Sequence, residues 1–445
     1  MSSLSQNRVG PDGVASTPTT YQVSNISLIA NNVKNKNASE YDYAYDITNM
    51  VAYFSVFERL DSPGMEVVLS VGDTLNLMEK IKLQGSEMVF ISVKRKEPTK
   101  QTVSHNIVLR IAEIFNYKRL KPGMSTYNLR CVSEHMYLNN LKILRTPFAG
   151  TPIEIISYIS KSILKESVEI SEGAKNIIQG VFPNVRPLQG IQWLLRQAYD
   201  ESTPFFYYQT LANNGQLHCK SYKSLLAEDE YDTYKLVPFI DPDIELETKE
   251  GYEYERTTIR DITSDYHQGK FLSAYNGAYA STLHTVDVAE KEYKVSYNSY
   301  KGTEYKLNRY IPFSSAIRAR HDAEVITEYP GSKAYFVSLN TKAFSDSNNY
   351  SSPAPNDLPK AMAYLENLNY QKHRIQIAGD FNMCVGKKVR IEIRRAQEEQ
   401  EGSGVDKLQS GVYLVTEIEH VFDKGYYQYL TIQKDSSEVD LDATK

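Results

Sequence analysis

The sequence predicts a mainly β protein of the α+β class, with two antiparallel β-barrel modules and an inserted domain that contains helices. Three observations support this fold class. Segments in which apolar residues alternate with polar ones cluster towards both ends of the chain. Helical periodicity is confined to the middle, and the two strand-rich ends share one outline. The length of 445 residues corresponds to about three domains.

The composition is that of a globular chain with an unusual number of tyrosines. Hydrophobic residues make up 41% of the chain, which allows cores of normal size. The 34 tyrosines stand beside a single tryptophan, and tyrosine suits half-buried sheet surfaces and interfaces. The net charge of −5 argues against a surface dedicated to nucleic acid.

Cysteine usage and the absence of targeting segments predict a protein that folds in a reducing cytoplasm. Cys131, Cys219 and Cys384 are odd in number and far apart, as expected for reduced thiols. No run of about 18 apolar residues occurs, so no membrane-spanning helix is expected. The N-terminus lacks the basic and apolar regions of a signal peptide.

Composition and periodicity divide the chain into six stretches. The first is a flexible arm rich in Ser, Thr, Gly and Pro, and the last is an acidic tail. The six are the arm (1–20), a first β-barrel domain (21–146), a helix-containing α+β insertion (147–235), a strand-rich middle region partly belonging to the second barrel (236–356), the closing strands of the second barrel (357–436) and the tail (437–445).

The first barrel domain is expected to consist of successive strands separated by turns. A turn at Ser62-Pro63-Gly64 separates the first two of them. The predicted strands lie within residues 45–60, 65–71, 85–93, 106–114 and 127–132.

The insertion begins with a helix signal. Thr151-Pro152-Ile153-Glu154 has the form of a capping box with proline at the first helical position, and apolar residues then recur at helical spacing up to Ile163. A second amphipathic helix is marked by Ile191, Leu194, Leu195 and Ala198. Strands are expected at 205–209 and 216–222.

The region that follows is rich in tyrosine and is predicted to be rich in strands. Residues 252–259 and 292–297 have the β-branched and aromatic composition of strands. A Ser/Asn/Pro loop at 345–356 ends it, and a short helix marked by Leu358, Met362, Leu365 and Leu368 leads into the last strands.

The last sixty residues alternate most clearly. We expect three antiparallel strands, each with one buried face, and each preceded by a turn. The predicted buried residues are Val389, Ile391 and Ile393, then Val412, Leu414, Thr416 and Ile418, and then Tyr427, Tyr429 and Thr431.

The two strand-rich ends echo one another. In both, a glycine precedes a strand, a charged loop leads to a second strand, and a tyrosine begins a third. The distance from Gly85 to Tyr127 is 42 residues, and that from Gly386 to Tyr427 is 41. One interpretation is that any two antiparallel meanders look alike. The other is a duplicated barrel module, of which three chains would place six similar units in a ring.

Six short segments carry a resemblance to a known family: 46–50, 67–73, 85–87, 127–132, 386–393 and 410–420. They resemble the central baseplate hub proteins of phages with contractile tails, and the N-terminal part of the spike protein of type VI secretion systems. The resemblance spans roughly residues 40–435 in domain order, and its C-terminal part is the most specific.

The resemblance implies a homotrimer with two tube-like β-barrel domains per chain, which forms a pseudo-sixfold ring. A trimeric spike would dock on one side, tail-tube or tube-initiator subunits on the other, and baseplate wedge proteins around the ring. Genome DNA would pass through without sequence-specific recognition and without membrane insertion. The expected location is the tail baseplate of a virion assembled in the host bacterial cytoplasm. The type VI protein continues into a needle, whereas this sequence stops at Lys445, so a separate spike is expected.

The sequence predicts no catalytic, cofactor-binding or metal-binding residues, and hence no enzyme. The histidines do not cluster, and His420 is expected to be a hydrogen-bonded structural residue. The stretch from Gly379 to Lys388 lacks the spacing, the Ser/Thr and the following helix of a phosphate loop. Gly402-Ser403-Gly404 lacks the spacing of a nucleophile elbow.

Two alternatives remain open from the sequence. A tail-associated hydrolase of cell wall or glycan would need a pair of carboxylates, for which Glu228/Glu230 and Asp241/Asp243 are candidates. A carbohydrate-binding adhesion module would use the tyrosines as a platform for sugars. Arg318, Arg320 and Lys333 could contact a phosphate or an acidic partner, although a salt bridge at the rim is the simpler interpretation.

Overall fold

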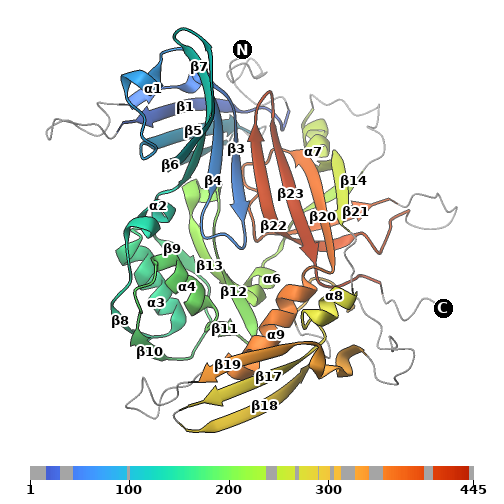
Figure 1. Cartoon of the computed structure of the whole chain (residues 1–445). Coiled ribbons are helices and arrows are strands. Elements are labelled where there is room, and N and C mark those ends of the chain that lie inside the picture. Colours follow the sequence, from blue (N-terminus) through green and yellow to red (C-terminus); the bar gives the residue numbers. More distant parts are fainter. Residues whose placement is uncertain are drawn as a thin grey trace.

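A curled sheet of 14 strands dominates the part of the chain that the structure describes (Figure 1). Helices and a smaller sheet lie below it in this view. The mainly β, α+β class predicted from the sequence is confirmed. The computed structural model describes residues 17–30, 44–97, 101–236, 248–265, 270–288, 290–300, 305–311, 326–339, 354–394 and 404–439.

The first half of the sheet, here called the N-module, comes from the N-terminal third of the chain. Its strands lie side by side in the order β1-β5-β6-β7-β4-β3, all antiparallel, with β2 (Ala44–Asp46) added at the outer edge of β1. A 3-10 turn (Thr48–Met50) and a short helix α1 (Leu77–Lys80) interrupt them. The six strands are β1 (Gln22–Ile29), β3 (Val51–Arg59), β4 (Glu66–Asp73), β5 (Met88–Lys96), β6 (Thr102–Lys121) and β7 (Met124–Ser133).

The second half, here called the C-module, is assembled from strands that are farther apart in the sequence. Their order is β14-β21-β22-β23-β20-β16, and β15 (Thr258–Ile259) lies outside β14. The six strands are β14 (Glu230–Leu236), β16 (Asp261–Asp265), β20 (Gln371–Ala378), β21 (Lys388–Ile393), β22 (Gly411–Phe422) and β23 (Tyr426–Lys434).

The two modules repeat the same strand order. Matched in chain order, β1, β3, β4, β5, β6 and β7 correspond to β14, β16, β20, β21, β22 and β23, and each pair of neighbours in one module is a pair of neighbours in the other. One ladder differs, because β14 runs parallel to β21 whereas β1 runs antiparallel to β5. The duplication predicted from the sequence is therefore confirmed at the level of strand order.

The repeat extends to an irregularity of the backbone. In the N-module the ladder between β6 and β7 has a β-bulge between Ile111 and Glu113, and in the C-module the ladder between β22 and β23 has one between Val415 and Glu417. Just before the bulge, the N–H of Ile111 donates to the carbonyl of Glu87 and that of Val415 to the carbonyl of Lys387, both at 2.9 Å. Ile111 and Val415 are therefore equivalent positions.

The insertion contains helices and a small sheet. The predicted capping box is confirmed, because the hydroxyl of Thr151 accepts from the N–H of Glu154 and the Glu154 carboxylate accepts from the N–H of Thr151. Its helical elements are α2 (Glu134–Leu141), α3 (Pro152–Tyr158) with a π-helical turn (Ile159–Ile163), α4 (Pro187–Leu195), α5 (Ala212–Gly215) and α6 (Tyr222–Ala227). Its strands are β8 (Pro147–Gly150), β9 (Val168–Ile170), β10 (Ile178–Val181), β11 (Tyr199–Asp200), β12 (Thr203–Gln209) and β13 (Leu217–Ser221).

A separate three-stranded sheet with the order β18-β17-β19 lies at the bottom of Figure 1, next to helix α9. It consists of β17 (Ala280–Asp287), β18 (Glu292–Ser299) and β19 (Ala334–Leu339), with 3-10 turns at Ile326–Glu328 and Pro330–Ser332. Helices α8 (Lys270–Tyr275) and α9 (Ala354–Asn367) accompany it. The helix predicted from Leu358 onwards is confirmed, and the predicted loop at 345–356 lies mostly outside the described residues.

The strand predicted at 252–259 is wrong over most of its length. Lys249–Thr257 forms helix α7, and only Thr258 and Ile259 are extended, as β15. The hydroxyl of Thr248 caps the helix by accepting from the N–H of Gly251 at 3.0 Å. Arg256 and Glu253 form an ion pair one turn apart. The capping residue and the i,i+3 pair therefore outweigh the weak strand preference of the tyrosines.

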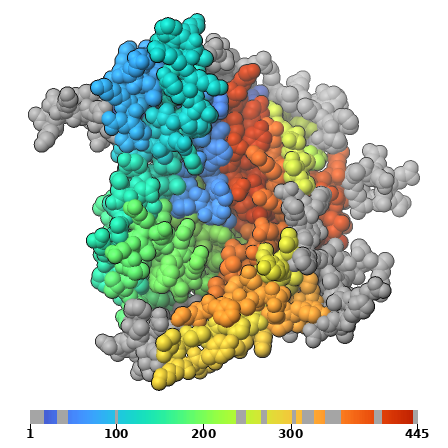
Figure 2. All heavy atoms as spheres, in the orientation of Figure 1, coloured from blue at the N-terminus to red at the C-terminus, as the bar shows by residue number. Residues whose placement is uncertain are grey.

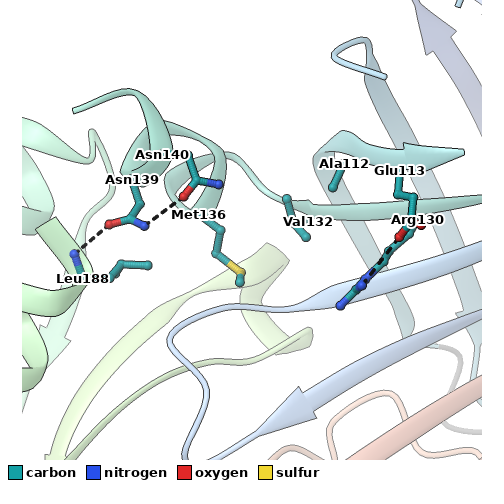
Figure 3. A pocket seen from close by; sticks show the side chains of 8 residues that line it. All are labelled: Ala112, Glu113, Arg130, Val132, Met136, Asn139, Asn140 and Leu188. Carbon is teal, nitrogen blue, oxygen red and sulfur yellow. Dashed lines mark hydrogen bonds and ion pairs between the residues drawn. The ribbon is translucent and has the colours of Figure 1, made fainter. Parts of the chain in front are cut away.

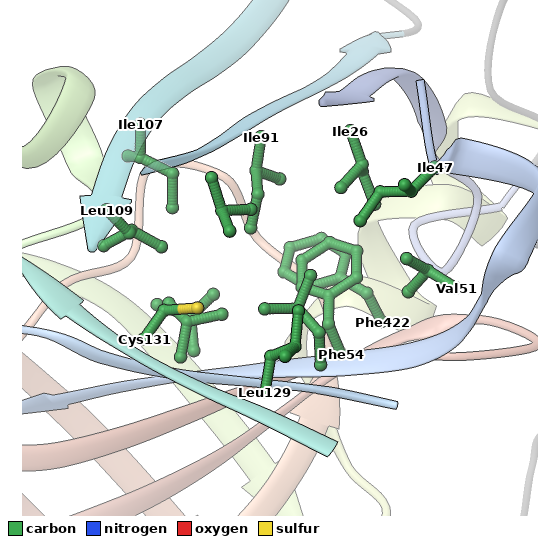
Figure 4. Close-up of a cluster of buried hydrophobic side chains, with 14 of the residues drawn as sticks. Ile26, Ile47, Val51, Phe54, Ile91, Ile107, Leu109, Leu129, Cys131 and Phe422 are labelled. Atoms are coloured by element: carbon green, nitrogen blue, oxygen red, sulfur yellow. The ribbon is translucent and has the colours of Figure 1, made fainter. Parts of the chain in front are cut away.

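Each module has its own apolar core. The N-module encloses a cluster to which β1, β3, β4, β5, β6 and β7 all contribute, with Ile91, Leu129 and Phe54 near its centre (Figure 4). The C-module encloses a second cluster that includes Ile391, Leu414 and Leu430. A third cluster lies within the insertion. In the space-filling view the N-module and the C-module meet along a continuous seam above the insertion (Figure 2).

The predicted inner face is correct for β21 and mostly wrong for β23. Val389, Ile391 and Ile393 are buried as expected. On β23 the inner residues are Tyr426, Gln428, Leu430, Ile432 and Lys434. Of the three residues predicted to be buried there, Thr431 is buried, whereas Tyr427 and Tyr429 point the other way and are only half-buried. On β22, Val412, Leu414, Thr416 and Ile418 are buried, but Tyr413 and Val415 are buried too, so this stretch has two covered faces rather than one.

Truncation of Leu414 tests the C-module core. Leu414 is completely buried, so we expect Leu414→Ala to lower the free energy of unfolding by about 2–5 kcal/mol. Glu419→Ala on the same strand is the matched control, because it removes only a partly exposed ion pair with Arg374 and should change stability by less than about 1 kcal/mol. Denaturant unfolding measures both, and equal effects would contradict the core assignment.

Candidate functional site

The joint between the N-module and the C-module is the best-defined candidate site. β22 has 12 residues and its hairpin partner β21 has 6, so the second half of β22 extends beyond β21. β3 occupies the edge that this extension leaves open, with an antiparallel register from Glu417 opposite Arg59 to Phe422 opposite Phe54. The backbone bonds of this ladder make the two modules one continuous sheet.

Aromatic rings close one end of the joint. Phe54 of β3 stacks on Phe422 of β22 with ring centroids 4.5 Å apart, and Phe422 stacks in turn on Tyr426 at 4.3 Å. All three side chains are completely buried. Figure 4 shows Phe54 and Phe422 beside one another within the N-module core. The C-terminal strands therefore contribute to the core of the N-terminal module, so that neither is packed completely without the other.

A buried carboxylate lies at the centre of the joint. Glu58 of β3 is 0% exposed, and one of its oxygens lies 3.1 Å from Nε2 of His420 on β22. The carboxylate also accepts from the backbone N–H groups of Leu211 in the insertion and Val385 in the C-module. A buried carboxylate is stable only when such partners replace its hydration, so Glu58 fixes three parts of the chain to one another.

His420 has a structural role, as the sequence predicts. Its Nδ1 atom lies 2.9 Å from the hydroxyl of Tyr426 and 3.1 Å from the side-chain nitrogen of Gln428. Both ring nitrogens are therefore within hydrogen-bonding distance of buried partners. Gln428 also donates to the carbonyl of Asp380 at 2.8 Å and accepts from the N–H of the same residue. This network aligns β22 and β23 with the segment that connects β20 to β21.

That connecting segment, residues 379–387, is held by N-module side chains. Arg95 of β5 is 3% exposed and donates to the carbonyls of Gly379 and Pro18. His105 of β6 bonds to the carbonyl of Phe381 at 2.8 Å, and burial lowers the pKa of this imidazole to about 4. At Gly379 an added Cβ would lie 2.0 Å from the ring of Tyr426, so only glycine fits there.

The same segment does not form a phosphate loop. Lys387 leads directly into strand β21, so the helix that follows a phosphate loop is replaced here by a strand. The ammonium of Lys387 donates to the carbonyl of Asn382 and lies 3.7 Å from the ring centroid of Tyr231. The Lys387 ammonium therefore interacts with groups of the protein itself.

Two pockets occupy related places in the modules. One, of about 300 Å³, lies beside the β6 bulge between the N-module and the insertion (Figure 3). Its lining residues are Ala112, Glu113, Arg130, Val132, Met136, Asn139, Asn140 and Leu188. The other, of about 270 Å³, lies beside the β22 bulge and includes Glu417 and Thr431, the equivalents of Glu113 and Arg130. Both mark the point at which a long strand leaves its hairpin partner.

The carboxylates considered for hydrolysis are engaged in ion pairs where the structure describes them. Glu228 pairs with Lys220 at 2.9 Å and Glu230 with Arg390 at 2.9 Å. Asp241, Asp243, Arg318 and Arg320 lie outside the described residues. Lys333 lies about 6 Å above the rings of Tyr275 and Tyr335.

Thiols and acidic clusters offer no evident reactive group in the described part of the chain. Burial raises the pKa of Cys219 and of Cys384 to about 12, and it raises that of Cys131 as well. Such thiols are poor nucleophiles. Within the described ranges, no group of three or more His, Cys, Asp or Glu side chains could hold a metal ion. No helix among the described residues is long and apolar enough to cross a membrane.

Sequence reasoning missed Glu58, Arg95 and Lys434, which are charged and buried. Each lies in a strand at an inward position, where an apolar residue is expected. Lys434 donates to the carbonyls of Leu408 and Ser410, and burial lowers its pKa to about 7. In the sequence, each of these charged residues is visible only as a member of an alternating pattern whose other members are mostly apolar. The groups that bond to it are too distant in the sequence to be identified from that pattern.

Comparison with solved structures finds likenesses to phage tail proteins and to a component of a type VI secretion system. The 43 kDa tail protein of prophage MuSo2 from Shewanella oneidensis superimposes with a TM-score of 0.50 at 8% identity, over 93% of this chain and 99% of that one. A tail protein from Neisseria meningitidis MC58 gives a TM-score of 0.48 at 10% identity over 93% and 97%. A component of the E. coli type VI secretion system, described as similar to the T4 tail proteins gp27 and gp5, gives 0.43 at 9% over 86% and 73%.

The fold of the chain is therefore that of a known phage tail protein, in agreement with the resemblance stated from the sequence. No protein-family model and no curated protein sequence matches the chain. The likeness lies in the fold, because the identities are about one residue in ten.

Removal of the Glu58 carboxylate tests the joint. Glu58→Ala leaves His420 and two backbone N–H groups without their buried acceptor, so we expect a loss of about 3–5 kcal/mol in the free energy of unfolding. Glu417→Ala is the matched control, because Glu417 also links β22 to β3, but through a largely exposed ion pair with Arg59, and should cost less than about 1 kcal/mol. Comparable losses measured in urea would contradict a central role for Glu58.

The buried histidines predict a dependence of stability on pH. Burial lowers the pKa of His105, His135 and His373 to about 4, from an ordinary value of 6.5. Between pH 6.5 and 4, these imidazoles therefore bind protons in the unfolded chain but not in the folded chain. The free energy of unfolding that is fully present above pH 6.5 is lost progressively as the pH falls towards 4. We expect the melting temperature to fall between pH 6.5 and 5, and to fall less steeply in His373→Gln. An unchanged slope would contradict the assignment.

Proposed function

We propose that this chain is the structural hub of a phage-like tail, in which a homotrimer forms a ring of six similar β modules. The observation that carries the proposal is the repetition of one six-strand order within a single chain. A protein with two similar modules converts threefold into pseudo-sixfold symmetry when three copies form a closed ring. The fold shared with the Shewanella prophage tail protein supports this role.

In this proposal the ring adapts two symmetries to each other. A trimeric spike docks on one face, and the hexameric tail tube, or its initiator, begins on the other. Wedge proteins of a baseplate, which we propose to be that of a contractile tail, surround the ring, and DNA passes through it without being read. The proposed domains are the two tube-like barrels, built mainly from 21–146 and 357–436 with part of 236–356, and the insertion at 147–235. Within the fold, α2 (Glu134–Leu141) packs with the insertion, and β14 (Glu230–Leu236) joins the sheet of the C-module. The location is the tail of the virion.

The role is architectural and requires no catalytic group. The carboxylates Glu228 and Glu230 are paired with cations, so no observation on the described residues favours the hydrolase alternative. The adhesion alternative retains one supporting observation. Val286, Tyr293, Val295, Tyr297 and Phe336 form an exposed apolar surface on the small sheet, and Tyr297 and Phe336 are more than 70% exposed. Glycan binding that is lost in Tyr297→Ala would favour it.

The native mass of the purified chain tests the proposal. One chain has a mass of 50.7 kDa, so the proposed trimer has a mass of about 152 kDa. Light scattering coupled to size exclusion should give this value over a range of concentrations. A stable dimer, or a monomer that persists at the highest concentration, would contradict the hub.

A further inference from the structure

Among the residues that the structure describes, the N-module has an uncovered strand edge. β6 contains 20 residues and β5 contains 9, and the ladder between them ends at Arg110 opposite Met88. Beyond Ile111, the strand continues for ten residues to Lys121 and pairs only with β7 on its other side, among the residues described. Residues 116–121 are all exposed, including the large side chains of Tyr117 and Leu120. A long exposed edge of this kind invites pairing with another strand.

The C-module shows what covers the equivalent edge. β22 is the counterpart of β6, and beyond Val415, the equivalent of Ile111, its free edge pairs with β3 of the N-module. The arrangement on the C-module is therefore complete within one chain. In the described part of the chain, the same arrangement on the N-module lacks one strand.

The counterpart of β3 supplies a candidate for the missing strand. That counterpart is β16, which pairs with β20 on one side and with no other described strand. Its backbone edge is thus also open within the described part of the chain, and Asp261 and Thr263 on it are exposed. β6 and β20, the neighbour of β16, lie on opposite sides of the large sheet in Figure 1.

We propose that residues 112–121 of β6 in one copy pair antiparallel with β16 of the next copy, as β22 pairs with β3 within each chain. This inference rests on the proposed trimer and specifies its contact. The partner is a second copy of this chain, because the repeat that leaves the edge open also supplies the matching strand. A head-to-tail contact of this kind forms a closed ring when the rotation between copies is 120°.

The internal joint predicts the register of the contact. Thr126 of β7 and Tyr427 of β23 are equivalent positions in the two modules. Lys118 pairs with Thr126 and Val421 pairs with Tyr427, so Lys118 of β6 occupies the place that Val421 has in β22. Through the ladders with β4 and β20, Thr263 occupies the place of Ser55. Since Val421 pairs with Ser55 within the chain, Lys118 should lie opposite Thr263 of the neighbouring copy.

The charges of the two edges are complementary. The exposed part of β6 carries Lys118, Arg119 and Lys121, whereas β16 begins with the exposed Asp261. Opposite charges on facing strands favour the pairing of β6 with β16. Two β6 strands would bring like charges together, which disfavours the pairing of β6 with a second β6.

Disulfide formation tests the contact. Facing residues of an antiparallel pair have Cα atoms about 4.5–5.5 Å apart, within the range that a disulfide spans. The variant Lys118→Cys/Thr263→Cys should give a covalent trimer on a non-reducing gel under mild oxidation, and reductant should reverse it. Both positions are exposed, so the fold should tolerate them, and the three native thiols are largely buried.

Two matched controls define the result. Val421→Cys/Ser55→Cys places the same pair at the internal joint and should give a cross-link within one chain, seen as lost thiols without a higher mass. Lys118→Cys/Tyr293→Cys, with the second cysteine on the exposed small sheet, should give no covalent trimer. Trimers of about 152 kDa that fail to cross-link at 118 and 263 would overturn this contact and leave the hub intact. Absence of any trimer would overturn both.

Charge reversal provides a second, independent measurement. Lys118→Glu/Arg119→Glu should raise the concentration at which trimers dissociate at least tenfold at low salt, and Asp261→Lys in the same chain should restore part of the loss. Dissociation that is unchanged in the double variant, or unaffected by Asp261→Lys, would contradict the pairing of these two edges.

Discussion

The ladder between β3 and β22 is the interaction on which the rest of the structure depends. It pairs residues 54–59 with residues 417–422, and so joins segments from opposite ends of the chain. Everything between them has to fold into domains that leave these two edges free to meet. Closing so long a loop costs conformational entropy, and only a large set of contacts offsets it. The stacked rings of Phe54, Phe422 and Tyr426 and the ladder itself provide that set.

Polar groups inside the joint make it specific. Buried charged groups often contribute no more to stability than apolar residues of the same size would, because each group loses its hydration. Glu58 of the N-module, however, is bonded at once to the insertion, through the N–H of Leu211, and to the C-module, through the N–H of Val385 and the ring of His420. Arg95 and His105 hold the segment that follows β20. A slipped register of β3 on β22 would leave these groups buried without partners. Other registers of β3 on β22 are therefore energetically disfavoured.

The features predicted correctly from the sequence are local. Alternation located β4, β5, β7 and β21, and the spacing of Thr151 and Glu154 located the start of α3. The repeat was also visible, because it places glycine and tyrosine at similar distances in both modules.

The errors arise where distant parts of the chain decide the outcome. Gln428 and Lys434 face inwards because carbonyls from other segments satisfy them, and this reversed the predicted faces of β23. The helix at Lys249–Thr257 was missed because tyrosine favours strands only weakly, while a threonine cap and an ion pair favour the helix. The order of the strands, and the pairing of β3 with β22, depend on contacts between residues that no local pattern relates.

In the proposed ring of six modules, one chain already contains one of the required contacts between modules. The internal joint between β3 and β22 shows the geometry of that contact, and the proposal repeats it at the edges of β6 and β16, which are open within the described part of the chain. Images of the purified protein viewed along the ring axis test this central claim most directly. The proposed hub predicts a closed ring of six similar lobes with threefold symmetry. Particles with only two lobes, or open chains of variable length, would contradict it.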